Sequence, residues 1–597
     1  MKEIIELIKD ELKNAFTACE MDEKYAICSV SNRPDLCQYQ CNGAMAAAKE
    51  YHKAPIAIAN EVVEKLAAVK MFAKAEACPP GFINIDISNE FLAEYVSQMS
   101  DDEFFGLEKE ADPKTIIVDF GGPNVAKPLH VGHLRSAIIG ESIKRILKYM
   151  GNNVIGDVHI GDWGLQMGLI IHELSLRKPD LVYYDESYEG EYPKEAPFTI
   201  SELEEIYPCA SGKSKATDDA GNVTEEAKEY KAAALAATAQ LQAGRRGYRA
   251  LLQHILDVSV TDLKRNYENL NVSFELWKGE SDAQPYIPDM VEKMKKDGFA
   301  YISEGALVVD VKEETDTKEV PPCMILKSDG ASLYNTTDLA TLVWRMEDYK
   351  PDHVIYVVDK RQDLYFTQVF RCAKKTGIVP QSTDLTFVGF GTMNGKDGKP
   401  FKTREGGVMR LEYLINEVNE KMLDKIKEND AIDAAEAEKT AKTVALAAIK
   451  YGDLSNQASK DYVFDVDRFT SNEGNTGPYI LYTIVRMKSI LAKAGVSVEE
   501  LKGKIVDCDN ESMTELMLEI TKLSAAMKTA YEDLAPHRIC AYIYDLCNAF
   551  NHFYHETKII QETDENKRNA YLALLDLTKR VLEQMIDLLG FAAPERM

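Results

Sequence analysis

The sequence lacks any run of about 18 uncharged apolar residues, the length that a membrane-spanning helix needs. Its first residues, Met1–Asp10, follow a mixed-charge amphipathic helix pattern. They contain neither the apolar stretch nor the cleavage site of a signal peptide. These absences argue against a helical membrane protein and against a secreted one. We expect a cytoplasmic protein that makes no contact with a membrane.

Cysteine pairs with the spacing of common metal sites are missing too. The chain contains 11 cysteines, but no two of them form a CxxC zinc motif. The nearest pairs are Cys37 with Cys41 and Cys540 with Cys547. We therefore expect reduced thiols, as is usual in the cytoplasm, and no structural metal held by the protein.

The sequence also lacks an excess of basic over acidic residues. Lys and Arg total 70 against 97 Asp and Glu, which gives a formal net charge of −27. Taken alone, this charge argues against a nucleic-acid-binding protein, because such proteins usually carry a basic surface. A large multidomain enzyme needs only a local basic track, however, so the total charge does not exclude a nucleic-acid partner.

The chain of 597 residues is long enough for several domains of about 150 residues each. Residues 1–110 alternate helical and strand patterns and predict a small α/β domain. Residues 111–460 predict a doubly wound parallel sheet, interrupted by an insertion at about 175–270 whose first part, 178–222, shows no clear periodicity. Residues 461–597 predict an all-α bundle from four helical patterns: Ile480–Leu491, Met513–Tyr531, Ile539–Glu556 and Asn569–Leu589.

The most informative segment joins a strand to a helix. Thr115–Phe120 is a β-branched apolar run that predicts a buried strand, and Gly121, Gly122 and Pro123 end it. A long helical pattern then begins near Val131. His130 and His133 are three residues apart, so both can face one ligand from the first helical turn. Gly132 between them has no Cβ, which lets a ring or a phosphate approach the backbone. This arrangement predicts a nucleotide-phosphate site.

His130-Val-Gly-His133 resembles the HIGH signature of class I aminoacyl-tRNA synthetases, although HxGH alone also occurs in small nucleotidyltransferases. The longer string from Gly122 to Ser136 resembles the arginyl-tRNA synthetase family. The resemblance implies a Rossmann-type catalytic domain, a small N-terminal domain and a helical anticodon-binding domain. It also implies ATP-dependent activation of L-arginine, with Mg²⁺ accompanying ATP, and transfer of the arginyl group to the 3′ adenosine of tRNA(Arg). The family typically needs bound tRNA for the first step.

A second phosphate-binding element is expected at Gly395–Gly407, where Lys396, Lys399, Lys402 and Arg404 lie between glycines. The segment resembles the KMSKS loop of class I synthetases, but Thr403 stands at the usual second lysine. In many arginyl enzymes a lysine before the HIGH motif is thought to substitute, and Lys127 matches that position. Which of Lys127, Lys399 and Lys402 contributes most is left open.

The resemblance assigns these residues to roles. The predicted catalytic residues are Lys127, His130, His133, Lys399 and Lys402. ATP is expected to contact His130, Gly132, His133, Asp162, Gln166, Lys399, Phe401 and Lys402. L-arginine is expected to contact Asn124, Glu280, Tyr334, Asp338 and Gln362. A guanidinium is a planar, permanently charged fork of donors, so Glu280 and Asp338 suit it, whereas lysine lacks the fork and citrulline lacks the charge.

Expected tRNA contacts lie at both ends of the chain. The segment around Asn42 resembles the N-terminal domain of arginyl enzymes, which touches the elbow of tRNA. Tyr479, Tyr482 and Arg486 begin the helical domain, and the resemblance makes them tRNA contacts. A plain docking domain and a helix-capping loop are the simpler readings of these two segments.

Three rival functions are compatible with parts of the sequence. Another class I synthetase is disfavoured by the missing zinc-ligand cysteines and by the paired acids Glu280 and Asp338. A small-molecule nucleotidyltransferase would not need the C-terminal helices. A non-catalytic tRNA-binding paralogue would not need His130, His133 or Lys127. We expect a monomer.

Overall fold

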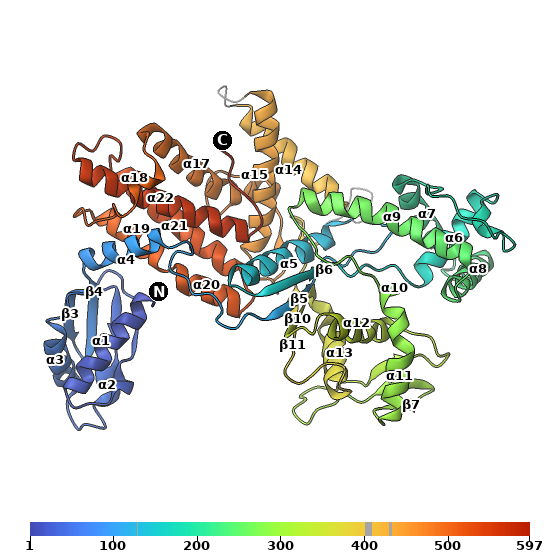
Figure 1. Ribbon diagram of the computed structural model, residues 1–597, viewed down its shortest axis with the longest axis horizontal. Coiled ribbons are helices and arrows are strands. Elements are labelled where there is room, and N and C mark those ends of the chain that lie inside the picture. The colour runs from blue at the N-terminus through green and yellow to red at the C-terminus, as the bar shows by residue number, and fades with distance from the viewer. Residues whose placement is uncertain (128, 400–408, 429–432) are drawn as a thin grey trace. The chain divides into compact units, whose positions relative to one another are not determined.

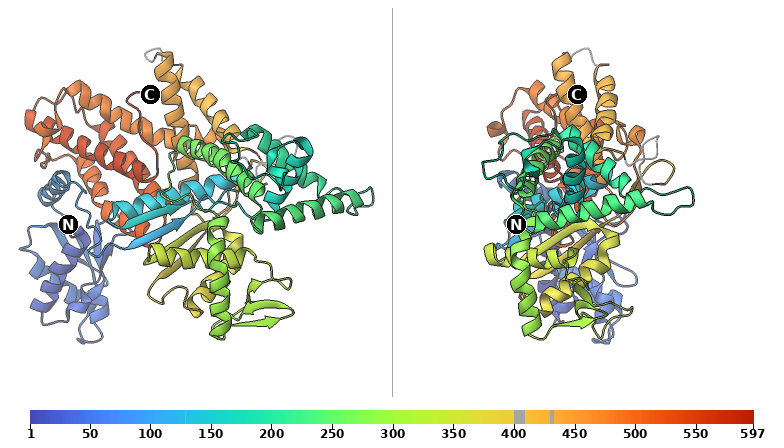
Figure 2. Two further views of the ribbon diagram at one scale, coloured as in Figure 1. Left: turned by 45° about the vertical axis from the view of Figure 1, so that its right-hand side comes forward. Right: turned by 90° about the vertical axis from the view of Figure 1, so that its right-hand side faces the viewer.

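The computed structural model describes residues 1–127, 129–399, 409–428 and 433–597 (Figures 1 and 2). The chain divides into two compact units. One comprises Met1–Lys109, Asn472–Asp587 and Ala592–Met597, and the other comprises Glu110–Ser471 with Leu588–Phe591. None of the helices in the described ranges combines the length and the apolar character that a membrane crossing demands. The predicted domain boundaries at 110 and 460 stay predictions.

The N-terminal part of the first unit is a four-stranded antiparallel sheet with helices. The strand order is β1-β2-β4-β3, and the strands span Cys28–Val30, Tyr39–Cys41, Phe72–Cys78 and Phe82–Ile87 in the order β1 to β4. Helices α1 (Ile4–Ala18), α2 (Gly43–Ala47) and α3 (Pro55–Leu66) accompany it, and α4 (Asn89–Asp101) follows. Ile4, Ile8 and Leu12 are buried, as expected for residues four apart on one helical face.

The C-terminal part of the first unit is helical. Its helices are α17 (Gly477–Ala494), α18 (Val498–Leu501), α19 (Glu511–Thr521), α20 (Leu523–Glu532), α21 (Pro536–Glu556) and α22 (Glu565–Leu588). The side chain of Thr476 caps α17 by accepting a hydrogen bond from the backbone N–H of Tyr479. The predicted single helix Met513–Tyr531 is wrong in one respect, because the chain breaks it at Lys522 into α19 and α20.

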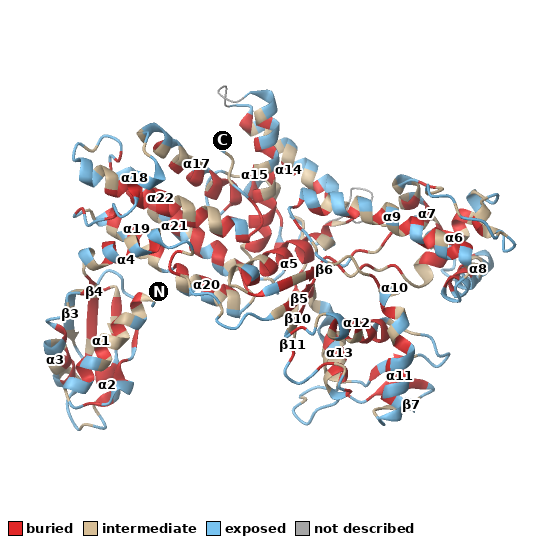
Figure 3. Ribbon diagram, in the orientation of Figure 1, coloured by how far each residue is buried: buried red, intermediate tan, exposed pale blue. Residues whose placement is uncertain are grey.

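The second unit is built on a four-stranded parallel sheet of order β11-β10-β5-β6. The strands are β5 (Thr115–Asp119), β6 (Asn153–Asp157), β10 (His353–Asp359) and β11 (Asp384–Phe390). Helix α5 (Val131–Tyr149) connects β5 to β6 and is buried along nearly its full length (Figure 3). The carboxyl ends of all four strands meet at one edge, where ligands bind in such sheets. The predicted fold class is confirmed.

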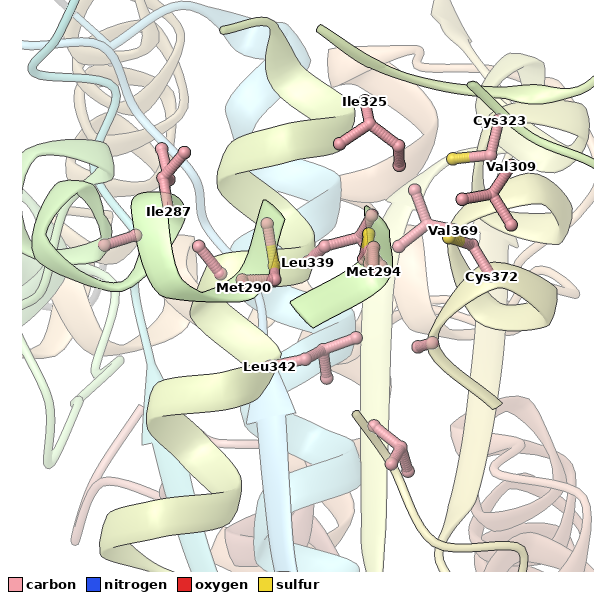
Figure 4. Close-up of a cluster of buried hydrophobic side chains, with 14 of the residues drawn as sticks. Ile287, Met290, Met294, Val309, Cys323, Ile325, Leu339, Leu342, Val369 and Cys372 are labelled. Atoms are coloured by element: carbon pink, nitrogen blue, oxygen red, sulfur yellow. The ribbon is translucent and has the colours of Figure 1, made fainter. Parts of the chain in front are cut away.

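A hydrophobic cluster supports the helices beside this edge. It includes Ile287, Met290 and Met294 of α11 (Ile287–Lys296), and Leu339 and Leu342 of α12 (Tyr334–Asp348) (Figure 4). A small antiparallel sheet and helix α13 (Asp363–Lys375) contribute further residues. The strands of that sheet are β7 (Ala300–Ser303), β8 (Ala306–Val309) and β9 (Cys323–Leu326). Burial of each large apolar side chain contributes about 1.5–3 kcal/mol, so α12 is firmly held.

The predicted insertion is helical and includes α7 (Ile200–Lys213), α8 (Glu225–Gln242) and α9 (Arg246–Asn269), and α6 (Leu165–Arg177) leads into it. The buried carboxylate of Glu173 joins three of these helices, accepting hydrogen bonds from Arg177, Lys213 and the Tyr230 hydroxyl at 2.6–3.0 Å. Burial alone would raise the pKa of Glu173, but the hydrogen bonds from Tyr230, Lys213 and Arg177 lower it to about 2. Helix α7 lies in the segment where the sequence shows no periodicity.

Candidate active site at the edge of the parallel sheet

The two histidines form the start of helix α5. His130 is the N-cap residue, and its backbone N–H donates to Nδ1 of His133 at 3.2 Å. Nδ1 of His130 accepts from the backbone N–H of Gly132 at 3.0 Å. Burial lowers the pKa of His130, and it lowers the pKa of His133 to about 3. Both rings are therefore neutral at physiological pH. Because Nδ1 of each ring accepts a hydrogen bond, the proton of each ring is on Nε2, where it can be donated to a ligand.

The structure gives a further reason for glycine at residue 132, besides the ligand approach that the sequence predicts. A Cβ at this position would lie 2.8 Å from Cε1 and 2.9 Å from Nδ1 of His130. The close neighbour is thus the histidine ring itself. A side chain at residue 132 would push that ring away from its place.

The basic loop is described only in part. Lys399 is exposed, and its backbone N–H donates to Asp397 Oδ1 at 3.1 Å. Nζ of Lys396 forms ion pairs with Asp465 at 3.1 Å and Asp467 at 3.0 Å, so these carboxylates already compensate its charge. The predicted residues Phe401 and Lys402, together with Thr403 and Arg404, lie outside the described residues.

The chain returns beside the histidines directly after that stretch. The backbone N–H of Val131 donates to the carbonyl of Met409 at 3.1 Å, and that of Leu411 donates to the carbonyl of Leu129 at 2.9 Å. Met409 and Leu411, which follow the predicted basic loop in the sequence, are therefore adjacent to the histidine segment.

A cavity of about 920 Å³ lies at the edge of the sheet. Five of the predicted site residues line it: Asn124, Lys127, Gln166, Glu280 and Tyr334. Nζ of Lys127 lies 4.6 Å from the centre of the Tyr207 ring, a cation–π contact that holds the lysine at the cavity wall. The side-chain amide of Gln166 donates to the carbonyl of Val125, which anchors the segment carrying Lys127.

The charges of two carboxylates act on Glu280, which lines the cavity. Glu280 begins helix α10 (Glu280–Ala283). Burial, and then the charges of Asp162 and Asp338, raise the pKa of Glu280 to about 8. Burial also raises the pKa of Asp162 and of Asp338. A group of acids that resist ionisation is suited to a cationic ligand, because the cation restores their charged form.

These acids are held in place by neighbouring hydroxyl and amide groups. The carboxylate of Asp162, a predicted ATP contact, accepts hydrogen bonds from the backbone N–H of Ser281, at 2.9 Å, and from the Ser281 hydroxyl. Asp338 accepts a hydrogen bond from the Tyr365 hydroxyl. Tyr334, one helical turn before Asp338, is 72% exposed. Gln362 is exposed and does not line the cavity.

Sequence reasoning missed the charged group beneath the cavity. Arg345 is completely buried and donates to Asp119 at 2.5 Å, to Asp157 at 2.7 Å and to the Tyr356 hydroxyl at 3.0 Å. An aspartate at the end of both β5 and β6 was the available signal. Asp119, Asp157 and His159 have the spacing of metal ligands. Arg345 already pairs with both aspartates, so their charge needs no metal ion.

The tRNA-contact residues predicted in the first unit lie on two separate elements. Asn42 is exposed and precedes α2. On α17, the guanidinium of Arg486 lies 4.8 Å from the Tyr482 ring and 5.2 Å from the Tyr554 ring, and it donates to Asn551 at 2.7 Å.

Tyr479 extends this polar and aromatic face. Its hydroxyl donates to Asn548 at 2.7 Å and accepts from Asn551 at 2.9 Å. Asn548, Asn551 and Tyr554 of α21 complete the face and were not found from the sequence. Their spacing of three residues along one helix was the available signal.

Known families match the chain over most of its length. The model of "tRNA synthetases class I (R), catalytic domain" matches residues 96–466. "DALR anticodon binding domain" matches residues 480–597, and "Arginyl tRNA synthetase N terminal domain" matches residues 2–87.

Individual proteins match as well. An arginine–tRNA ligase of Agathobacter rectalis is 66% identical, and one of Alkaliphilus oremlandii is 56% identical, each with 100% of both chains covered. Among solved structures, the arginyl-tRNA synthetase of Plasmodium falciparum has a TM-score of 0.79 at 25% identity, with 100% of both chains covered. That of Thermus thermophilus has a TM-score of 0.77 at 21% identity, again over 100% of both chains, which bears on the fold alone.

Proposed function

The chain belongs to the arginyl-tRNA synthetase family, and we propose that its cavity of about 920 Å³ is the place where arginine and ATP react. As a class I aminoacyl-tRNA synthetase, it ligates arginine to tRNA with ATP as co-substrate. The first step joins the arginine carboxylate to the α-phosphate of ATP and releases pyrophosphate. The second step moves the arginyl group to the terminal adenosine of tRNA(Arg), on the 2′-hydroxyl.

The cluster of Glu280, Asp338 and Asp162 carries the proposal for the arginine side chain. A pKa of about 8 for Glu280 means that this carboxyl is largely protonated until a cation arrives. The guanidinium supplies a permanent charge and several donors, so it pairs with two acids at once. Asn124 and Tyr334, which line the same cavity, complete the arginine side, and Gln362 stays a prediction.

The phosphates of ATP are proposed to lie against the start of α5. His130 and His133 offer Nε2–H donors there, and the helix dipole favours an anion at this end. Lys127 adds a full positive charge from the cavity wall. These groups stabilise the charge that develops on the α-phosphate and on the leaving pyrophosphate. Mg²⁺ is proposed to enter with ATP as part of that substrate.

Transfer to tRNA is proposed to use contacts in the first unit. Arg486, stacked between two tyrosines, presents a cation with aromatic neighbours, a combination that suits unstacked bases and phosphates. Asn42 is the proposed contact of the N-terminal domain. A monomeric state and a cytoplasmic location are also part of the proposal, and sedimentation and cell fractionation test them.

ATP–pyrophosphate exchange tests the proposed function. The full-length protein is assayed with each of the twenty amino acids, with and without tRNA. We expect exchange with arginine alone, and only when tRNA is present. Exchange with a different amino acid would contradict the arginine pocket, and no exchange under any condition would favour a non-catalytic tRNA-binding protein.

A further inference from the structure

Two arginines in the second unit are almost wholly removed from water, Arg135 at 1% and Arg345 at 0% exposure. Burying a guanidinium is costly unless it is paired and hydrogen-bonded. Arg345 pairs with the two aspartates beneath the cavity. Arg135 pairs elsewhere, and the function described so far gives it no role.

Arg135 binds three separate segments of the chain. Its Nε lies 3.0 Å from Oδ2 of Asp453, which belongs to helix α15 (Ala434–Leu454). Its Nη1 donates to the carbonyl of Gly391 at 2.7 Å and to that of Lys460 at 3.1 Å. The Tyr462 ring lies 5.0 Å from the guanidinium carbon, and its hydroxyl donates to the same Asp453 oxygen at 2.9 Å.

The first element that Arg135 joins is its own helix, α5, which begins with the two histidines. Arg135 lies on α5, two residues after His133, so its guanidinium is tied to the first turns of that helix. Any shift of Arg135 along or around the helix axis would move the two imidazoles with it.

The second element is the segment Gly391–Gly395 that leads into the basic loop, which we call the base of that loop. Gly391 directly follows strand β11, and β12 (Met393–Asn394) then pairs in parallel with β13 (Tyr462–Val463). A Cβ on Gly391 would lie 2.6 Å from the backbone carbonyl of Lys460, so only glycine allows the two carbonyls to meet one guanidinium. The chain reaches Gly395, where the basic loop begins, four residues later.

Stability alone does not explain the arrangement well. Nη2 of Arg135 and Oδ1 of Asp453 are both buried, and neither has a hydrogen-bond partner among the residues that the structure describes. An ion pair that keeps such groups is often no more stabilising than an apolar pair of the same volume. The contribution of this ion pair is therefore to geometry, because it fixes the positions of α5, α15 and the segments at Gly391 and Lys460 relative to one another.

We propose that Arg135 is a positioning residue for adenylate formation, which holds the histidine-bearing start of α5 in register with the base of the Gly395–Gly407 loop. The inference rests on the proposed function, since it assigns both elements to ATP. Because the reacting groups must be aligned closely, a small displacement between the two elements slows the chemical step. Arginine binding depends on other contacts and is unaffected.

The test compares three variants of the full-length protein. Arg135→Lys keeps the charge but loses the fork that bridges the two carbonyls. Tyr462→Phe removes one hydrogen bond to Asp453 and keeps the ring, so it tests the same network in a protein that folds. Arg345→Lys is the matched control, an equally buried arginine that binds Asp119 and Asp157 instead. Arginine-dependent pyrophosphate exchange is measured with saturating tRNA, and rates are expressed per titrated active site.

Arg135→Lys is expected to lower kcat on the order of 100-fold, as misplacement of reacting groups does, with the KM for arginine unchanged. Tyr462→Phe is expected to lower kcat about tenfold, the effect of one lost hydrogen bond. Arg345→Lys is expected to raise the KM for arginine instead.

Parental kcat per active site in Arg135→Lys and Tyr462→Phe would overturn the inference, and so would a rise in arginine KM equal to that of Arg345→Lys. Lack of exchange in the parent protein would instead overturn the proposed function and the inference together.

Discussion

Glu280 would be ionised at neutral pH in water, but in the cavity burial and two neighbouring carboxylates raise its pKa to about 8. His133 changes in the opposite direction, because burial lowers its pKa to about 3. Both shifts favour the neutral form of the side chain. At the scale of single residues, burial therefore keeps Glu280 and His133 largely uncharged at neutral pH.

Lys127 is the residue for which the sequence leaves a choice open. Lys127→Met should lower the kcat of adenylate formation, because the charge next to the α-phosphate is lost, and should leave the KM for arginine unchanged. A loss of about 2–3 kcal/mol, on the order of 30- to 160-fold, is typical for a charged hydrogen bond.

Single-turnover adenylate formation measures the effect of Lys127→Met. Lys228→Met, in an exposed pair on α8 with Glu225, is the control. A normal rate in Lys127→Met would return the catalytic role to Lys399 and Lys402.

Some of these residues could be predicted from the sequence, and others could not. His130, His133 and Glu280 were found because short motifs of the family contain them. The pair of Arg345 with Asp119 and Asp157 joins positions more than 180 apart in the chain, and no local pattern predicts such a contact. The extent of burial, which determines the pKa of Glu280 and His133, likewise depends on long-range packing.

At the scale of elements, the strand β5, the glycine-containing loop and the helix α5 were predicted correctly, since a β-branched run and helical periodicity are strong signals. Two elements were not. Helix α7 lies in a polar segment, and only its capping box, Thr199 with Glu202, marks its start. The break at Lys522 has neither glycine nor proline, and Lys522 itself has helical dihedral angles, so periodicity continues through it.

Gly132→Ala tests the start of α5 as an element. The added methyl group would collide with the His130 ring, so adenylate formation should fall at least tenfold while the unfolding temperature changes little. Gly212→Ala is the matched control, because a Cβ at that helical position of α7 meets no atom of the described residues within 4 Å. That change should leave activity intact and add about 0.5–1 kcal/mol of stability. Equal activity in both variants would show that the position of His130 is unimportant.

At the scale of the whole molecule, a net charge of −27 coexists with a tRNA substrate. Local arrangement resolves this conflict, because a cation needs only to stand where the phosphate or base binds. Arg486, with Tyr482 and Tyr554 beside it, is the place that we propose for such a contact in the first unit. Total charge was therefore a poor guide to the partner, as the sequence reasoning expected.

Arg486→Gln should raise the KM for tRNA on the order of tenfold, because a stacked cation is lost, and should reduce the slope of its salt dependence by about one. The KM values for arginine and ATP at saturating tRNA should stay unchanged. Lys528→Gln, at an exposed position on α20, is the control. Aminoacylation kinetics at several salt concentrations give both quantities, and an unchanged KM for tRNA would remove this face from the tRNA contacts.

The proton balance of arginine binding tests the central claim, the carboxylate pocket, most directly. Below pH 8 the Glu280 carboxyl is largely protonated, and the guanidinium favours its ionised form. Because folding raises the pKa of Glu280, the folded protein without arginine loses stability relative to the unfolded chain as the pH rises from 4.5 through 8. Bound arginine opposes that loss, because it favours the ionised carboxylate. Its affinity should therefore rise with pH up to about 8.

Calorimetric titration of arginine at about pH 7, roughly one unit below the pKa of Glu280, in two buffers of different ionisation enthalpy, counts the protons. We predict that the parent protein releases most of one proton and that Glu280→Gln releases none, with a higher Kd. Glu292→Gln, at an exposed acid on α11 that pairs with Lys295, should behave as the parent does. Tight binding without proton release, equal in the parent and in Glu280→Gln, would contradict the account.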